Sequence, residues 1–459
     1  MKHTCILLVL LSAVIGTQAQ EPAFHIKFSE PLAVFEFVND LSADAPDNPF
    51  KKAFDSSAFD RDKYKTLLAA FDTLNIDYSY EYTRYPYAQK IGGSTASLLE
   101  KTLIGSPTIN DFKLSAIGII PNVDLFKLCT ILTEFTPVYE QLIYRPNKRR
   151  FDDQLSELGH LLTVKNIPAY WQAGLIFYHS SWDSSIPFTI SLYPLPGSKH
   201  FTATAMYDDA ISALPTGLKD YNKLLSVMLH ETFHILYDEQ SLLFKKDIQK
   251  WFTGNPSKSS RYAYLLMNEA LATALGNGYV YGQLSGAEDT AAWYHRKYIN
   301  LMAKKIYPLV KSYILQKRAM DKAFVDQYIQ MYDDNFAGWL LDVNNIMTDR
   351  YVLSDNPDDF TVIDRKFPYR SMSDYENGIS EGAIGKMKQA PITKIIIVSK
   401  NNKEQLGLIK RGFTELGNWV PDDRTDFSYP VFLGDKTWLI VINDVQKTTE
   451  EQIETLRLP

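Results

Sequence analysis

The chain has 459 residues and a mass of 52.5 kDa, which is more than one hydrophobic core usually organises, so two or three domains are expected. With 45% hydrophobic and 22% charged residues, its composition excludes a disordered or fibrous protein. The net charge of −6, without long basic runs, argues against a nucleic-acid partner.

The first twenty residues have the pattern of a secretory signal peptide. Lys2 and His3 form a short basic start, an apolar run follows at Cys5–Ile15, and Ala19 lies in a small-residue cleavage region. A retained membrane anchor is the alternative, but the apolar run is shorter than the ~18–20 residues that cross a bilayer. We therefore expect cleavage after residues 1–20, no stable membrane insertion afterwards, and a periplasmic or extracellular location.

Residues 21–185 are predicted to form a mainly helical N-terminal region. A strand is expected at Ala23–Phe28. Apolar residues then recur at helical spacing in Tyr64–Leu74, Asp124–Tyr144 and Phe151–Leu162.

The middle region, residues 186–353, begins with strands and continues as a series of helices. Strand-like runs at Phe188–Tyr193 and His200–Tyr207 are separated by a turn rich in Pro and Gly. A polar, proline-bearing stretch follows at residues 354–391, which we interpret as a long connection between domains.

Residues 392–459 are predicted to form a small α/β domain. Its expected elements are a strand at Lys394–Lys400, a helix at Lys403–Leu416, strands at Val431–Leu433 and Thr437–Ile442, and a helix at Thr449–Leu456. The domain contains no His or Cys and no pair of residues suited to catalysis. We therefore expect it to support the fold or to dock a substrate.

The chemistry is concentrated in a predicted amphipathic helix at residues 220–237, which carries the sequence HExxH. Residues i and i+4 lie on one helix face, so His230 and His234 can bind the same metal ion while Glu231 lies beside them. Two His and one further carboxylate would leave zinc an open position for water, with Glu231 as general base. Because the motif has only three fixed letters, it arises by chance in roughly one chain in a hundred of this size.

A third metal ligand must come from another part of the chain, and a second predicted helix at Ser260–Leu275 offers Glu269. The residues Gly276, Asn277 and Gly278 are expected to end this helix. Glu269 lies among apolar and small residues, where a carboxylate is unfavourable unless it is paired or bound to metal. A surface glutamate on an Ala-rich helix is the alternative.

These residues resemble the gluzincin branch of zinc metallopeptidases, in which HExxH is followed by a glutamate ligand within an NExxA-like helix. The resemblance covers Phe188–Gly278. It implies zinc ligation by His230, His234 and Glu269, with Glu231 as general base and later proton shuttle. The two strand-like runs before the HExxH helix would supply an exposed edge that aligns an extended substrate.

The sequence also departs from the better-known gluzincin families. The separation of His234 from Glu269 is longer than in thermolysin-like enzymes and in the gluzincin aminopeptidases, so an extra loop is expected at about Gln240–Ser259. Thr273 stands where thermolysin-like enzymes carry an aspartate that supports a ligand.

The resemblance further implies a donor that stabilises the tetrahedral oxyanion, usually a Tyr or His from a helix downstream of the third ligand. His295 is the first candidate. Tyr294 and Tyr298 are its neighbours on the same predicted helix.

The sequence thus predicts an α+β protein with a zincin-like core of a small sheet plus helices, a helical N-terminal region and a small C-terminal α/β domain. The expected function is that of an exported zinc-dependent metallopeptidase acting on a peptide or protein substrate. Two alternatives stay open, a non-catalytic protein of zincin fold and a glycan- or peptide-binding protein. The second would use tryptophans such as Trp171, Trp182, Trp251 and Trp293.

Overall fold

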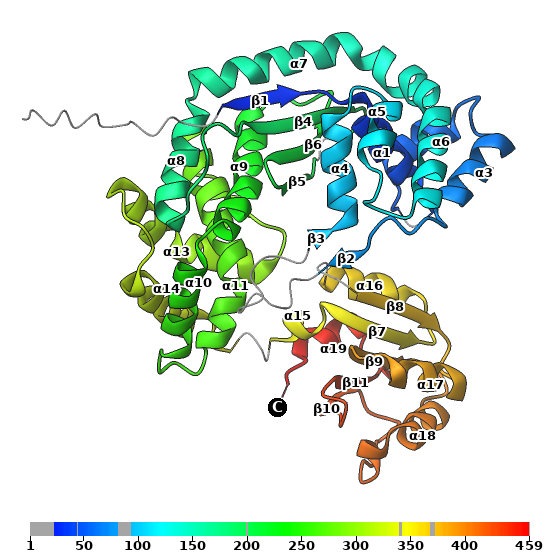
Figure 1. Cartoon of the computed structure of the whole chain (residues 1–459). Helices are drawn as coiled ribbons and strands as arrows, with labels where there is room; N and C mark the ends of the chain where they lie inside the picture. The colour runs from blue at the N-terminus through cyan, green and yellow to red at the C-terminus, as the bar shows by residue number, and fades with distance from the viewer. Residues whose placement is uncertain are drawn as a thin grey trace, which may run out of the picture. The chain divides into compact units, whose positions relative to one another are not determined.

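The computed structural model describes residues 23–43, 45–80, 93–198, 201–338, 342–367 and 372–458. The predicted signal peptide, residues 1–20, lies outside the described residues. The chain is an α+β protein (Figure 1) that divides into two units. The first contains Met1–Tyr294 and Ile299–Gln330, and the second contains His295–Tyr298 and Met331–Pro459.

A four-stranded mixed sheet lies at the centre of the first unit. Its strand order is β1 (Phe24–Lys27), β4 (Phe188–Leu195), β6 (Asp209–Pro215) and β5 (Ala203–Met206). The strands β1, β4 and β6 are parallel, and β5 is an antiparallel edge strand. The predicted strands in this region are confirmed, but β6 was not predicted. It separates β4 from β5, which the sequence left as sequential neighbours.

Helices of the N-terminal region pack around one large aromatic core, in which Phe37 contacts the rings of Phe50, Phe135 and Tyr139. The elements are α1 (Glu30–Leu41), α2 (Pro49–Asp55), α3 (Asp62–Phe71), the short strands β2 (Ser79–Tyr80) and β3 (Gly93–Ser94), α4 (Thr95–Gly105), α5 (Ile109–Ser115), α6 (Asn122–Tyr139), the π-helix η1 (Glu140–Tyr144), α7 (Arg145–Val164) and α8 (Ile167–Tyr178). The predicted helical character is confirmed. However, β1 pairs with β4, so this region and the middle region share one sheet.

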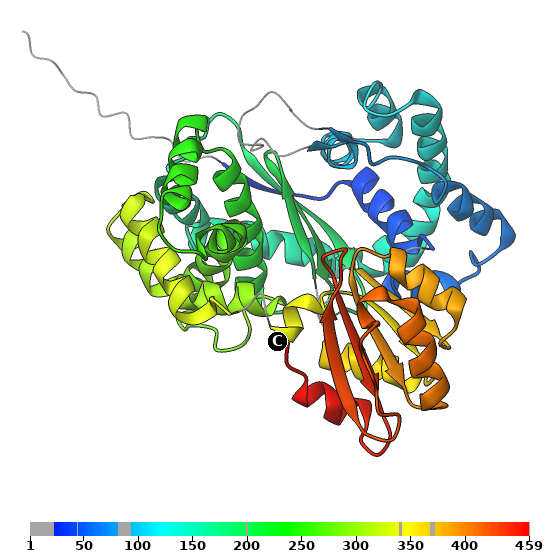
Figure 2. The same ribbon diagram turned by 90° about the horizontal axis from the view of Figure 1, so that it is seen from below.

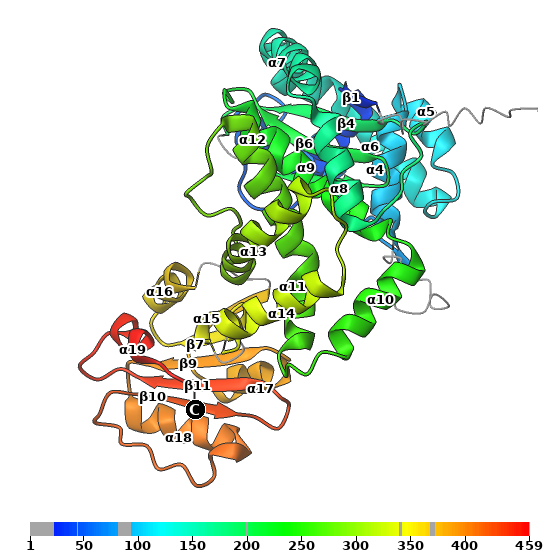
Figure 3. The same ribbon diagram turned by 90° about the vertical axis from the view of Figure 1, so that its left-hand side faces the viewer.

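A second group of helices follows the sheet, most of it in the first unit (Figure 3). It consists of α9 (Tyr221–Asp238), α10 (Leu242–Thr253), α11 (Ser260–Thr273), the π-helix η2 (Ala274–Val280), α12 (Tyr281–Ser285), α13 (Lys297–Leu315) and α14 (Lys322–Phe336). The predicted helices at 220–237 and 260–275 are confirmed as α9 and α11. The extra loop expected at Gln240–Ser259 is wrong, because most of that segment forms α10, whose residues Phe244, Ile248 and Phe252 are buried.

The second unit is built on a five-stranded sheet with helices on both faces (Figures 1 and 2). Its elements are α15 (Val343–Ile346), β7 (Asp349–Ser354), α16 (Asp358–Lys366), β8 (Met372–Asn377), α17 (Glu381–Gln389), β9 (Thr393–Val398), α18 (Asn402–Gly412), the 3-10 turn η4 (Thr414–Leu416), β10 (Phe427–Phe432), β11 (Trp438–Asn443) and α19 (Thr449–Thr455). The strand order is β10-β11-β9-β7-β8, and only β10 is antiparallel to its neighbour.

The interpretation of residues 354–391 as a connection is wrong. This stretch contains α16, β8 and α17, and β8 pairs with β7 as an integral strand of the sheet. The sequence of β8, MSDYEN, is polar because it is an edge strand with its side chains mostly exposed or half-buried. It therefore lacks the apolar alternation that identifies a strand. The α/β unit begins well before residue 392.

Carboxylates of the chain itself occupy the anion-binding positions at the carboxyl ends of the parallel strands in this unit. Asp355 accepts hydrogen bonds from the N–H groups of Ser399 and Lys400 at 3.2 and 3.0 Å. Asp426 accepts three backbone N–H groups from residues 445–447. In open α/β sheets ligands bind outside these strand ends. Here five backbone N–H groups at the strand ends already donate to carboxylates of the chain itself.

A buried threonine, Thr449, joins two further carboxylates at the same end of the sheet. Its hydroxyl oxygen lies 2.7 Å from Asp359 Oδ1 and also contacts Asp444 Oδ2. A hydroxyl has one hydrogen and can donate it to only one carboxylate. Two carboxylates thus compete for one hydroxyl hydrogen. Burial raises the pKa of Asp444 from 3.8 to about 6, although the hydrogen bonds of Thr449 and Gln452 oppose this shift.

We expect the stability of the second unit to depend on the protonation of Asp444. Because its pKa is raised in the folded chain, the stability that it contributes is complete below about pH 4 and is lost as the pH rises through 6. At about 1.4 kcal/mol per pKa unit the full shift corresponds to about 3 kcal/mol, and because Asp444 is only half-buried, solvent screening reduces the loss to roughly 1 kcal/mol. Asp444→Asn should therefore gain stability relative to the parent between pH 4 and pH 7, measured by urea unfolding. The exposed Asp374→Asn is the control, and an equal pH response in both variants would contradict the assignment.

Candidate metal centre

Helix α9 carries the HExxH residues on a segment that is anchored by packing. Asp220 begins the helix by accepting a hydrogen bond from the Asn222 N–H at 3.1 Å. Most of the helix circumference is buried, with Met228 and Phe233 almost inaccessible. The side chain of His230 is only 4% exposed. The imidazole is thus held in place rather than free to rotate in solvent.

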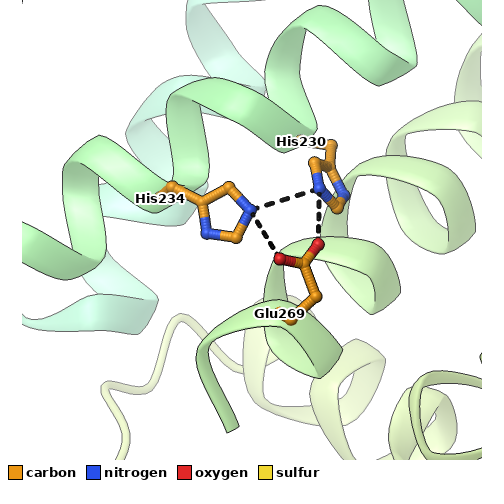
Figure 4. Close-up of side chains that lie close together, drawn as sticks. All are labelled: His230, His234 and Glu269. Atoms are coloured by element: carbon orange, nitrogen blue, oxygen red, sulfur yellow. Dashed lines mark hydrogen bonds and ion pairs between the residues drawn. The ribbon is translucent and has the colours of Figure 1, made fainter. Parts of the chain in front are cut away.

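Helix α11 brings Glu269 against the two histidines (Figure 4). Glu269 Oε1 lies 3.0 Å from His230 Nε2, and Glu269 Oε2 lies 3.5 Å from His234 Nε2. The two Nε2 atoms are 3.2 Å apart. The predicted metal ligands therefore meet in space, and among the described residues they form the one group of His, Cys, Asp and Glu side chains with the spacing of a metal site.

The geometry of the three donor atoms fits zinc. Zinc bonds of about 2.0–2.1 Å that point to the corners of a tetrahedron place neighbouring donors about 3.3 Å apart. The observed separations of 3.0, 3.2 and 3.5 Å bracket that value. In addition, the buried Glu269 Oε1 has no donor with hydrogen-bond geometry among the described residues, although His230 Nε2 is close. An unsatisfied carboxylate oxygen beside two imidazoles suits a cation.

The electrostatics of the cluster are those of a buried ion pair. Burial alone would lower the pKa of His234, but the hydrogen bond and negative charge of Glu269, helped by Asn268, raise it to about 9. Burial opposes ionisation of Glu269, yet the neighbouring imidazoles bring its pKa far below the usual range. The cluster therefore holds a proton at neutral pH when no metal is bound.

Glu231 lies beside the cluster without completing it. Its Oε1 atom is 3.8 Å from His230 Nε2, farther than the corresponding atom of Glu269. Burial raises the pKa of Glu231, and the nearby imidazoles partly offset this effect. A carboxylate with a raised pKa next to a metal site is suited to accept and return a proton near neutral pH.

The oxyanion donor expected at His295 stays a prediction, and the neighbouring Tyr294 contacts the cluster. The ring of Tyr294 stacks on His230 with centroids 5.9 Å apart and an interplanar angle of 20°. Helix α13 begins only at Lys297, so Tyr294 and His295 precede it, and His295 and Tyr298 belong to the second unit. Tyr298 donates a hydrogen bond to Asp342 there. The prediction placed the start of the helix too early.

Asn268 is a functional neighbour that the sequence reasoning did not assign. Its Oδ1 atom lies 3.0 Å from His234 Nδ1, so it can accept a hydrogen bond from the ring nitrogen that does not face Glu269. This contact fixes the tautomer in which Nε2 is free to bind metal. The sequence contains no periodic signal for this role, since consecutive residues of a helix point about 100° apart and only the position of α9 brings Asn268 to His234.

Comparisons with protein families, curated proteins and solved structures found no match for this chain. Within the described residues, no helix has both the length and the apolar character required to cross a bilayer.

Zinc affinity should increase with pH over an unusually high range. Zinc must displace the proton held by His234, whose pKa is about 9, so affinity should rise about tenfold per pH unit from pH 6 to pH 8.5. Competition with a coloured chelator measures this slope. Glu269→Gln removes the main cause of the raised pKa and should move the rise to lower pH. Constant affinity above pH 7 in the parent protein would contradict the ion pair.

Substitutions of Asn268 should weaken zinc binding to different degrees, depending on whether they keep an acceptor for His234 Nδ1. Asn268→Leu removes the acceptor for His234 Nδ1 and should weaken zinc binding about 10- to 100-fold, the usual effect of losing an outer-shell partner. Asn268→Asp keeps an acceptor at the same place and should retain most of the affinity. Isothermal titration with zinc distinguishes them. Equal affinities in both variants would show that Asn268 does not orient the ring.

Proposed function

We propose that this chain is an exported, zinc-dependent metallopeptidase of gluzincin type, which hydrolyses peptide bonds in a peptide or protein substrate. The observation that carries the proposal is the convergence of His230 Nε2, His234 Nε2 and a Glu269 carboxylate at 3.0–3.5 Å. A second carboxylate, Glu231, lies beside them and is not needed as a ligand. Export is supported by the predicted signal peptide at residues 1–20.

The described residues have distinct roles in this proposal. His230, His234 and Glu269 would hold zinc, which when bound would polarise the scissile carbonyl and lower the pKa of a water molecule. Glu231 would accept a proton from that water and return it to the leaving amine. Tyr294, stacked on His230, is the described tyrosine best placed to face the reacting groups.

The sheet of the first unit supports a peptide as the substrate class. Strand β5 is an edge strand that pairs with β6 on one side only, and it packs against α9, the helix that carries HExxH. The backbone groups along an edge strand can bind an extended peptide by strand addition. A substrate aligned in this way would lie along the helix that bears the cluster.

One observation favours the alternative of a glycan- or peptide-binding protein. A cavity of about 770 Å³ in the first unit is lined by Trp182 together with polar side chains that include Gln172 and Glu239. An aromatic surface with a few hydrogen-bonding groups is typical of small-ligand sites. None of the HExxH residues lines this cavity, so binding there would be independent of metal.

Three variants test the proposed roles. His230→Ala and His234→Ala should lose bound zinc, whereas Glu231→Gln should keep the metal and lose hydrolysis by at least about 100-fold, as expected for removal of a general base. The exposed His160→Ala is the matched control and should behave as the parent. Metal content is measured by mass spectrometry, and activity on a peptide library is measured with and without a chelator.

The outcomes separate the candidate functions. Equal loss of metal in all three variants would mean that Glu231 is a ligand and not the base. A parent protein that binds zinc but cleaves no peptide favours a non-catalytic protein of zincin fold. A parent protein that binds no zinc would contradict the metallopeptidase proposal and favour the binding protein.

A further inference from the structure

Helix α11 does not end at the glycines that were expected to stop it. After Thr273 the chain continues without a break through the π-helix η2 (Ala274–Val280) into α12. Gly276 and Gly278 have helical backbone angles and lie inside η2. A π-helical turn is rare and occurs mostly as a local insertion at functional sites. Here the π-helical turn follows directly after α11, the helix that carries Glu269.

Gly276 makes the closest approach of this segment to the metal cluster. A Cβ atom added at Gly276 would lie 2.5 Å from His230 Cβ, 2.7 Å from His230 Cα and 2.8 Å from His230 N. Two of these three atoms are backbone, so no side-chain rotation at His230 relieves the contact. An ordinary contact at 3.4 Å or more would require the two helices to separate by about 1 Å.

His230 is consequently held at both ends by one continuous helical element. Glu269 contacts its imidazole at 3.0 Å, and Gly276, seven residues later, contacts its backbone. The wider π-helical turn begins between these two residues, yet both lie against His230. The continuous segment α11–η2 therefore sets both the place of the His230 backbone and the position of the carboxylate that meets its ring.

We propose that Gly276 and the π-helix η2 are a positioning element of the metal site, which sets how closely the helix of Glu269 approaches His230. The inference rests on the proposed zinc site. A shift of about 1 Å is large compared with the ±0.2 Å tolerance of metal-ligand distances. Adding one methyl group at Gly276 should thus weaken metal binding about 10- to 100-fold, as loss of an outer-shell support does.

Gly278 provides a matched control in the same π-helix. A Cβ atom at Gly278 would meet side-chain ring atoms of Trp293 and Tyr307 at 2.8–3.0 Å, and none of these three nearest atoms belongs to His230. Gly276→Ala and Gly278→Ala each add one methyl group at a crowded position of η2, but only the first meets the backbone of a proposed metal ligand. A purely structural role of η2 predicts the same effect for both.

The experiment compares the full-length parent, Gly276→Ala and Gly278→Ala. Zinc affinity is measured by chelator competition, and the geometry of the site is read from the visible absorption of the Co²⁺-substituted protein. We expect Gly276→Ala to show weaker binding and an altered Co²⁺ spectrum, and Gly278→Ala to retain both properties of the parent. Parent-like affinity and spectrum in Gly276→Ala would overturn the inference. Absence of metal binding in the parent would overturn the proposed function instead.

If Gly276→Ala does not fold, hydrogen exchange on the parent protein tests whether η2 is coupled to the metal site. Because η2 contacts the backbone of a ligand, zinc should slow amide exchange in residues 274–280. The other π-helix, η1 (Glu140–Tyr144), has no contact with the cluster among those described and serves as the internal reference. Zinc binding without added protection of residues 274–280 would show that η2 is not coupled to the site.

Discussion

The close approach of α9 and α11 brings two imidazoles and one carboxylate together in a small, half-buried space. The candidate metal site depends on this packing of the two helices. Burying ionisable groups is unfavourable unless they are paired. The cluster responds by pairing His234 with Glu269, which moves their pKa values in opposite directions. Two protonated imidazoles at 3.2 Å would repel each other. A divalent cation resolves this conflict better than protons do, because one ion can contact all three donors.

Glycines allow helices to approach α9 closely at two places. Gly276 of η2 meets the backbone of His230, and Gly174 of α8 faces Phe233, whose ring atoms lie 2.5 and 2.9 Å from the position of an added Cβ. Helix α9 also packs against β5 and β6. Small residues at both contacts let the neighbouring backbones come near enough to fix the helix axis. Packing can then position the helix that carries the two histidines, while the hydrogen bond of Asn268 orients the ring of His234.

The residues of the candidate cluster could be predicted from the sequence because the spacing of the two histidines on one helix is a local property. His230 and His234 are separated by one turn, and Glu269 lies in an apolar setting that requires a partner. The role of Gly276 could not be predicted in this way. A Gly-Asn-Gly run is a local signal for a helix end, whereas its actual use, contact with His230, is a tertiary feature. The polar edge strand β8 was missed for a related reason, since its pairing with β7 compensates for a weak local pattern.

The carboxylates of Asp355, Asp426 and Glu269 have different surroundings in the two units. In the second unit Asp355 and Asp426 are supplied with backbone N–H donors, so the strand ends that commonly bind ligands are occupied by the chain itself. In the first unit Glu269 Oε1 and His230 Nδ1 are buried without a hydrogen-bond partner among the described residues. Unsatisfied buried atoms are costly, and others occur in the described residues, including Gln405 Oε1 and Ser428 Oγ of the second unit. Glu269 differs from these because its carboxylate lies beside two imidazoles, and a cation shared with them is the partner that this donor set favours.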